Sequence, residues 1–101
     1  MKEKFLPIGT VVTLKGSDKP LMITEHIVFS QKTDAAKTYD YGSCPFPTGV
    51  QKNLSIGFNH GDIEKILYMG YENEKQKELS KFLVDNEEKI INEIKTKLSN
   101  K

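Results

Sequence analysis

Two histidines and one cysteine, His26, His60 and Cys44, are the residues of this sequence best suited to acid–base, nucleophilic or metal chemistry. Cys44 stands near prolines with no predicted helix after it, so it lacks the electropositive setting that activates a thiol. A structural zinc site uses four ligands at regular spacing, which these three residues do not supply. The glycines are scattered singly and form no phosphate-binding loop. The sequence therefore predicts a protein that is not an enzyme, with no catalytic residue, no cofactor and no metal site.

One short segment, the turn of interest formed by Asn59, His60 and Asp62, keeps an enzymatic alternative open. A histidine followed two residues later by an aspartate has the pattern of a general base with an orienting carboxylate. In a glycine-containing turn, Asn and Asp side chains more often accept hydrogen bonds from backbone N–H groups. We therefore expect a structural turn here, and a half-exposed strand position for His26.

Length and composition favour a single small globular domain. The 101 residues are 37% hydrophobic and 29% charged, which is typical of a folded chain with a thin core. The formal net charge of +1 gives no electrostatic support to binding of nucleic acid or of an anionic membrane surface. A single cysteine suits a reducing compartment, and no apolar run approaches the ~18 residues of a membrane span. We expect a soluble cytoplasmic protein without nucleic-acid or membrane partners.

Short runs of β-branched and aromatic residues, separated by glycine and proline, predict a small antiparallel sheet. Pro45 and Pro47 remove backbone donors, so the segment from Cys44 to Gly49 is expected to be irregular. The stretch 58–71 is expected to hold the last strand and the hinge onto a C-terminal helix. The five predicted strands are 10–15, 21–29, 38–42, 52–58 and 65–69.

The fold class expected from this pattern is α+β. We predict a five-stranded antiparallel twisted sheet, or a partly open SH3-like barrel, followed by a C-terminal amphipathic helix. Residues 1–71 would form the small β domain, and 72–101 a helical extension packed on it within a single structural domain. The predicted core residues are Leu6, Ile8, Val12, Leu14, Leu21, Ile23, Ile56, Phe58, Ile66, Tyr68, Leu79, Phe82 and Leu83.

The C-terminal helix is the most strongly patterned element, with apolar residues at helical spacing from Leu79 to Leu98. One continuous helix is favoured because neither glycine nor proline interrupts it. Asp85 and Glu88 have the spacing of a capping box, so a break near Asp85 stays open. A continuous helix would be about 40 Å long, while a compact chain of this size has a radius of gyration of about 13 Å.

The far apolar stripe of such a helix would reach past the sheet. We therefore expect it either to dock on another protein or a second copy, or to fold back at a break; a helix lying across one sheet face is the plainer alternative. The first half offers a second candidate surface, because its aromatics flank the proline segment and either line a peptide groove or cap the end of a barrel. The candidate partner-binding residues are Tyr39, Tyr41, Phe46, Ile90, Ile91, Ile94 and Leu98.

Three blocks of this sequence together resemble a small family of Gram-positive bacteria classed as a domain of unknown function. The blocks are LPIGTVVTLKG at 6–16 with LMI at 21–23, YDYG at 39–42 with PFPTG at 45–49, and FNHGDI at 58–63 with GY at 70–71. Members of that family are often encoded near type VII (Esx/LXG) secretion clusters. The resemblance implies an accessory role, such as an adaptor or chaperone for a secreted partner, and implies no catalytic residue.

The function favoured by the sequence is a non-enzymatic protein-binding accessory module. Its partner would be another protein, or a second copy, bound through the C-terminal helix. Two alternatives stay open: a small enzyme using His60 and Asp62, with or without Cys44, and an immunity protein that neutralises a toxin.

Overall fold

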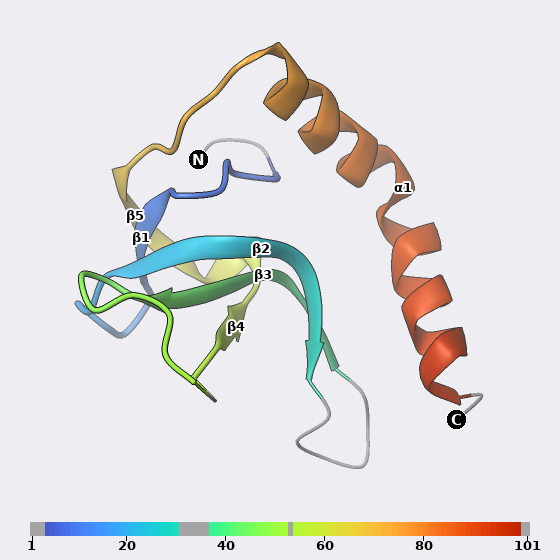
Figure 1. Ribbon diagram of the computed structural model, residues 1–101, viewed down its shortest axis with the longest axis horizontal. Coiled ribbons are helices and arrows are strands. Elements are labelled where there is room, and N and C mark those ends of the chain that lie inside the picture. Colours follow the sequence, from blue (N-terminus) through green and yellow to red (C-terminus); the bar gives the residue numbers. More distant parts are fainter. Residues whose placement is uncertain (1–3, 31–36, 53, 100–101) are drawn as a thin grey trace.

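The computed structural model describes residues 4–30, 37–52 and 54–99, with the side chains of Ser30, Leu98 and Ser99 left out of the description. Its sheet is antiparallel throughout, in the order β4-β3-β2-β1-β5, and a single long helix follows it (Figure 1). The predicted α+β class is confirmed. The elements are β1 (Val11–Leu14), β2 (Leu21–Ser30), β3 (Lys37–Pro45), β4 (Ile56–Phe58), the 3-10 turn η1 (His60–Asp62), β5 (Ile63–Tyr68) and α1 (Glu74–Ser99).

The sheet is open but curled, because its two edge strands are joined by a very short connection. In a flat sheet, β4 and β5 would lie about 19 Å apart at ~4.8 Å per strand. Only residues 59–62 join Phe58 to Ile63, and with η1 at ~2.0 Å per residue they reach about 13 Å. The backbone N–H of Lys15 at the end of β1 donates to the carbonyl of Asp62 at 2.9 Å, which fixes this closure. The curl gives the sheet a concave face.

The core on this concave face includes two residues that come from outside the sheet. Phe5 and Leu6, in the segment that precedes β1, are each only 2% exposed. They pack with residues from β1, β2, β3, β4 and β5 into one cluster. The cluster consists of Phe5, Leu6, Val12, Leu21, Ile23, Tyr41, Phe58 and Ile63.

Four predicted core residues are wrong. Ile8 is 49% exposed, since a turn with Gly9 at φ 90° turns it outward while Leu6 takes the inward place. Tyr68 is 66% exposed, because the register between β1 and β5 shifts beside Val11 and changes which side chains face inward. Leu79 and Phe82 are 46% and 56% exposed, since only a narrow side of α1 is covered.

The third strand is longer than the sequence predicts. β3 includes Cys44 and Pro45, which were expected to be irregular, and Pro45 lies at the last position of the strand. A proline at a strand end removes no interior ladder bond, which is why the pairing reaches it. β4 is shorter than predicted and pairs only with β3, from Ile56 to Phe58.

α1 is a single helix of 26 residues, so the favoured continuous form is confirmed and the break near Asp85 is absent. The side chain of Asn73 accepts the N–H of Gln76 at 2.8 Å and caps its first turn. Within the helix, Asn86 donates from Nδ2 to the carbonyl of Phe82 at 2.9 Å, so this polar residue is accommodated without interrupting the helix.

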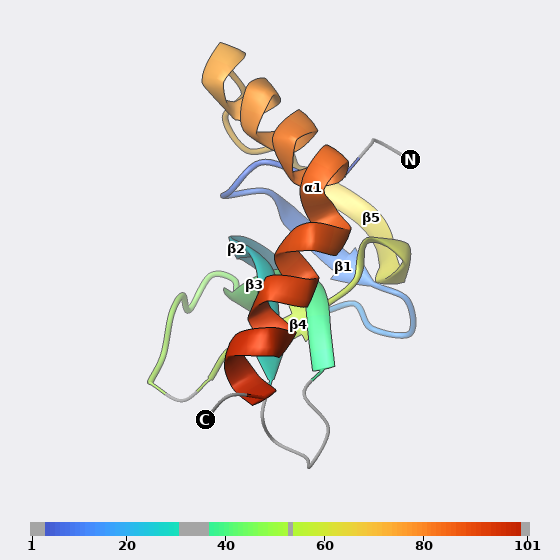
Figure 2. The same ribbon diagram turned by 90° about the vertical axis from the view of Figure 1, so that its right-hand side faces the viewer.

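Strand β2 bends near its end, where Ile27 has a positive φ of 51°. This is an unusual conformation for a β-branched residue. Both views place the second half of α1 beside the bent ends of β2 and β3 (Figures 1 and 2). The first half of α1 instead faces the segment Lys4–Pro7, which separates it from the sheet. The helix is therefore held at two places along its length.

Candidate functional site

The backbone of Leu6 is held by two side chains of the sheet. Its N–H donates to the hydroxyl of Tyr41 at 3.1 Å, and its carbonyl lies 2.6 Å from Nε2 of His26. Because this segment is not a strand, its buried polar groups need side-chain partners. His26 therefore lies in a partly buried strand position, as expected, and serves to seat the N-terminal segment.

The turn of interest is connected to the N-terminal segment through Tyr41. Nδ1 of His60 lies 2.8 Å from the Tyr41 hydroxyl, and the His60 N–H donates to Asp40 Oδ2 at 2.9 Å. The carboxylate of Asp62 accepts the N–H of Asn59 at 2.9 Å, and Asn59 Oδ1 accepts the N–H of Asp40 at 3.1 Å. The structural interpretation of this turn is thus confirmed, with Asp62 used as a capping group.

Tyr41 is fully buried at the centre of this network. Its ring packs at 5.9 Å from Phe5 and 5.2 Å from Phe58, between ring centroids. The pKa of Tyr41 is raised to about 12, chiefly by burial; the hydrogen bond from Leu6 lowers it, and the nearby carboxylates of Asp40 and Glu87 add to the rise. The hydroxyl therefore stays protonated at neutral pH and links His60 to the N-terminal segment.

Lys4 joins the sheet to α1. Its ammonium lies 3.3 Å from Asp40 on β3 and 2.9 Å from Glu87 on α1. Burial alone would lower the pKa of Lys4, but the two carboxylates outweigh it and the net direction is upward. The charged form of Lys4 is therefore stabilised, and its two ion pairs connect α1 to the sheet.

A second connection runs from α1 to the N-terminal segment. The Ser80 hydroxyl donates to the carbonyl of Phe5 at 2.7 Å, and Gln76 Nε2 lies 2.9 Å from Ser80 Oγ. Leu83, one turn further along, packs against the core cluster. The first half of α1 thus sits on residues 4–7 through one hydrogen-bonded chain, one ion pair and one apolar contact.

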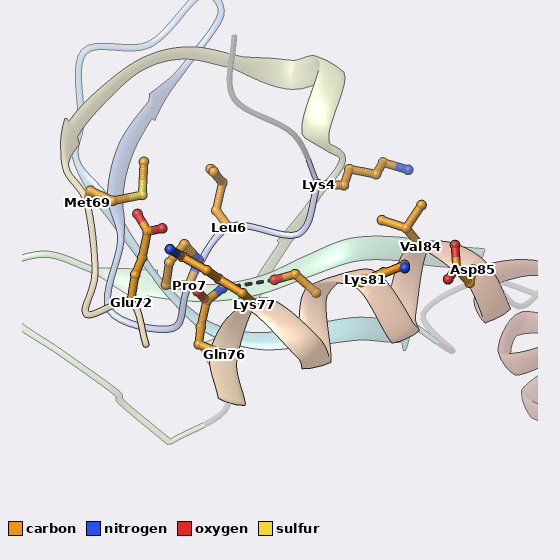
Figure 3. A pocket seen from close by; sticks show the side chains of 11 residues that line it. Lys4, Leu6, Pro7, Met69, Glu72, Gln76, Lys77, Lys81, Val84 and Asp85 are labelled. Atoms are coloured by element: carbon orange, nitrogen blue, oxygen red, sulfur yellow. Dashed lines mark hydrogen bonds between the residues drawn. The ribbon is translucent and has the colours of Figure 1, made fainter. Parts of the chain in front are cut away.

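A cleft of about 680 Å³ lies beside these connections. Figure 3 shows its apolar lining, which includes Leu6, Pro7, Met69 and Val84, and the charged side chains around it. Lys77, Lys81 and Asp85 recur at every fourth residue of α1, so they lie in a row along the helix edge of the cleft. An open cleft with an apolar floor and a charged rim has the character of a binding site.

The predicted aromatic surface of the first half is not one patch. Tyr41 is buried, so its assignment to a partner surface is wrong; the curl of the sheet turns it into the core. Tyr39 is half-buried, and its ring lies over Gly57 of β4, leaving no room for a Cβ there. Phe46 is 47% exposed and stays available at the surface.

The apolar residues of α1 are arranged differently from expectation. Ile90, Ile91 and Ile94 are half-buried. Both ribbon views place this part of α1 beside the bent ends of β2 and β3 (Figures 1 and 2), and binding of a partner through these three residues stays a prediction. Leu98 falls outside the described side chains. The exposed apolar residues lie in the first half, where Leu79 and Phe82 are one turn apart.

The described residues contain no group of three metal-ligating side chains. Cys44 is buried and free. No helix in the described part of the chain has both the length and the apolar character that crossing a bilayer requires.

Comparison with protein families gives one decisive finding. The sequence model described as Domain of unknown function (DUF4176) matches residues 5–79, most of the chain. The chain belongs to this family. Searches of curated proteins and of solved structures gave no match. The family match begins at Phe5 and ends at Leu79, so it includes the N-terminal segment and the first turns of α1 that meet at the cleft.

Sequence reasoning missed the cleft residues Lys4, Gln76 and Ser80. One signal was present: Asn73 and Gln76 have the capping-box spacing, which places Gln76 in the first helical turn. No pattern in the sequence links this turn to Lys4, more than seventy positions earlier. The cleft of this chain is therefore a feature that the sequence alone does not predict.

Proposed function

We propose that this protein is a non-enzymatic protein-binding accessory module that recognises another polypeptide through α1. The observation that carries the proposal is the exposure of Leu79 and Phe82, at 46% and 56%, on a helix that contacts the N-terminal segment through a neighbouring side. Two large apolar side chains at i and i+3 are the anchors by which helices commonly bind a partner helix or groove.

The contacts of the turn of interest favour this proposal over the enzymatic alternative. His60 and Asp62 each make a hydrogen bond that holds the fold, to Tyr41 and to Asn59. A general base and its orienting carboxylate would need to be directed at each other and at a substrate. These contacts support a structural role for the turn, with binding left to α1.

The resemblance to a family encoded near type VII secretion clusters leads us to propose a finer role. In it the protein acts in the cytoplasm of a Gram-positive bacterium as an adaptor or chaperone for a secreted polypeptide. The partner would present an amphipathic helix whose apolar side covers Leu79 and Phe82. In the complex, the apolar side of the partner helix would be shielded from contacts with other proteins.

The test is co-expression of the tagged full chain with the products of neighbouring genes, followed by purification of stable complexes. We expect one neighbour to be recovered at a fixed ratio. The double variant Leu79→Glu/Phe82→Glu should lose that partner, because charges cannot be buried in an apolar contact without a partner of opposite charge.

The matched control is Val50→Glu/Leu54→Glu, which adds the same two charges at apolar residues that are 76% and 40% exposed in the segment between β3 and β4. It should leave partner recovery unchanged. Recovery of no neighbour, or equal loss from both variants, would count against recognition through α1.

A further inference from the structure

One buried polar atom of α1 lacks a hydrogen-bond partner among the described residues. It is the side-chain oxygen Oε1 of Gln76, which lines the cleft. A buried acceptor without a donor costs free energy, about 1–3 kcal/mol in comparable cases. Such atoms in folded proteins call for a specific explanation, and one is a ligand that supplies the donor.

The orientation of the Gln76 amide is set by its neighbours. The Phe5 carbonyl can only accept, so the Ser80 hydroxyl must use its single proton there. Ser80 Oγ must then accept from Gln76, which assigns the amide nitrogen to Ser80 and leaves Oε1 directed elsewhere. Exchanging the two amide atoms would set two acceptors against each other, so the unpartnered atom is the oxygen.

Two residues of the N-terminal segment next to Gln76 offer no backbone donor to this oxygen. The Leu6 N–H is already used by the Tyr41 hydroxyl. Gln76 points toward Pro7 in Figure 3, and proline has no N–H. Within residues 4–30, 37–52 and 54–99 no donor reaches this oxygen, so a bound ligand would be able to supply one.

We propose that the cleft between α1 and residues 4–7 binds an extended segment of another polypeptide, with a backbone N–H donating to Gln76 Oε1. The inference rests on the proposed function and names the chemistry of the partner. Extended chains carry unpaired N–H groups and present side chains alternately to two sides. A small rotation of the flexible amide torsion would bring Oε1 to such a donor.

The lining specifies which side chains that segment carries. Apolar side chains would contact the floor formed by Leu6, Met69 and Val84. Lys77 and Lys81 are adjacent on the rim, both are exposed, and within the described chain neither forms an ion pair. Glu72 and Asp85 also line the cleft, so its charges are mixed. The proposed segment alternates apolar and acidic residues and places its acidic groups opposite Lys77 and Lys81 only.

The experiment is a titration of the isotope-labelled full chain with one defined probe, an acetylated and amidated tetrapeptide of alternating leucine and aspartate, followed by NMR. We expect saturable shifts of the backbone amides of Gln76, Lys77, Ser80 and Lys81. The Gln76 side-chain signals should also move. Two comparison peptides, one with N-methylated backbone and one with lysine replacing aspartate, should bind about three- to tenfold more weakly, the loss expected for one hydrogen bond or charge contact.

Matched variants test the two contacts in the protein. Lys77→Ala/Lys81→Ala should weaken binding of the aspartate probe, while Lys75→Ala/Lys89→Ala removes the same charge from positions of α1 outside the cleft and should not. Gln76→Met removes the unpartnered acceptor, together with the amide donor to Ser80 Oγ, so it should abolish the preference for the unmethylated probe.

Absence of shifts at the cleft amides up to about 5 mM probe, the range of the weakest specific binding, would overturn the proposal. Equal binding of the methylated and unmethylated probes would overturn the role of Gln76. If a partner is recovered but the probe does not bind, the proposed partner surface on α1 stands and the peptide-binding role of the cleft fails. If the probe binds but no partner is recovered, the role of the cleft stands and the proposed function fails.

Discussion

The hydroxyl of Tyr41 lies 2.8 Å from Nδ1 of His60. Through this contact His60, the candidate general base of the sequence, supports the fold. The same hydroxyl accepts the N–H of Leu6, so one tyrosine joins η1 to the N-terminal segment. That segment in turn forms the seat of α1. The position of the helix, and of the cleft beside it, therefore depends on a buried polar network at the concave face of the sheet.

The first prediction concerns the loss of this hydroxyl. Tyr41→Phe leaves the Leu6 N–H and the His60 ring nitrogen without their partner in a buried site, so it should lower the free energy of unfolding by about 2–4 kcal/mol. Urea denaturation followed by circular dichroism measures the effect. Tyr68→Phe removes a hydroxyl from an exposed ring and should change stability by less than about 0.5 kcal/mol. Equal effects of the two variants would contradict the network.

The second prediction concerns alkaline pH. The folded-state pKa of Tyr41 is about 12, above the value of about 10 for an unfolded tyrosine. The unfolded state therefore loses its proton first, and the stabilisation by Tyr41 is fully present below pH 10 and lost as pH rises to about 12. The loss amounts to about 2–3 kcal/mol.

Stability curves of the wild type and of Tyr41→Phe between about pH 8 and pH 12 separate this contribution from that of other groups titrating there. The difference between the two curves should shrink as pH rises above 10. Parallel curves over the whole range would show that burial of Tyr41 does not set this dependence.

The third prediction concerns the clasp between Lys4 and Glu87. Both side chains are partly exposed, so their coupling in a double-mutant cycle of Lys4→Met and Glu87→Gln should be modest, about 0.5–1 kcal/mol. It should weaken as salt is added. Amide hydrogen exchange in the first half of α1 should rise in either variant. Lys89→Met, a matched change on the exposed side of the same helix, should leave that exchange unchanged.

The fourth prediction concerns the close contact between Tyr39 and β4. A Cβ on Gly57 would lie 2.6 Å from the Tyr39 ring, so Gly57→Ala should force the ring to move and cost about 1–3 kcal/mol. Gly61 in η1 has no neighbouring atom within 4 Å of the same position. Gly61→Ala should therefore be neutral or stabilise by about 0.4–1 kcal/mol, because it restricts the unfolded chain. Thermal denaturation of the pair distinguishes these directions.

Local pattern accounts for the elements that sequence reasoning found. The β-branched run at Val11–Leu14, the alternation at Ile56 and Phe58, and the helical spacing after residue 72 each depend on neighbours in the chain. The same holds for the turn at Asn59, whose capping contacts lie within four residues. These features could be predicted because their physical causes are local.

The errors share a different cause. Ile8 and Leu6 are equally apolar and two residues apart, and only the turn at Gly9 decides which one enters the core. Tyr68 follows the strand alternation until a register shift with β1 reverses it. Bulges and turns of this kind depend on how distant strands pair, which composition and periodicity do not record.

Sequence pattern predicted the α+β class and the structural turn around His60 and favoured a single helix over a broken one, since propensity, periodicity and capping act over a few residues. Only the tertiary structure decided that residues 4–7 lie between sheet and helix, that Tyr41 is buried, and that Gln76 faces a cleft. Those outcomes depend on contacts between positions up to 83 residues apart. Such contacts form only where the curled sheet brings its edges and the helix together.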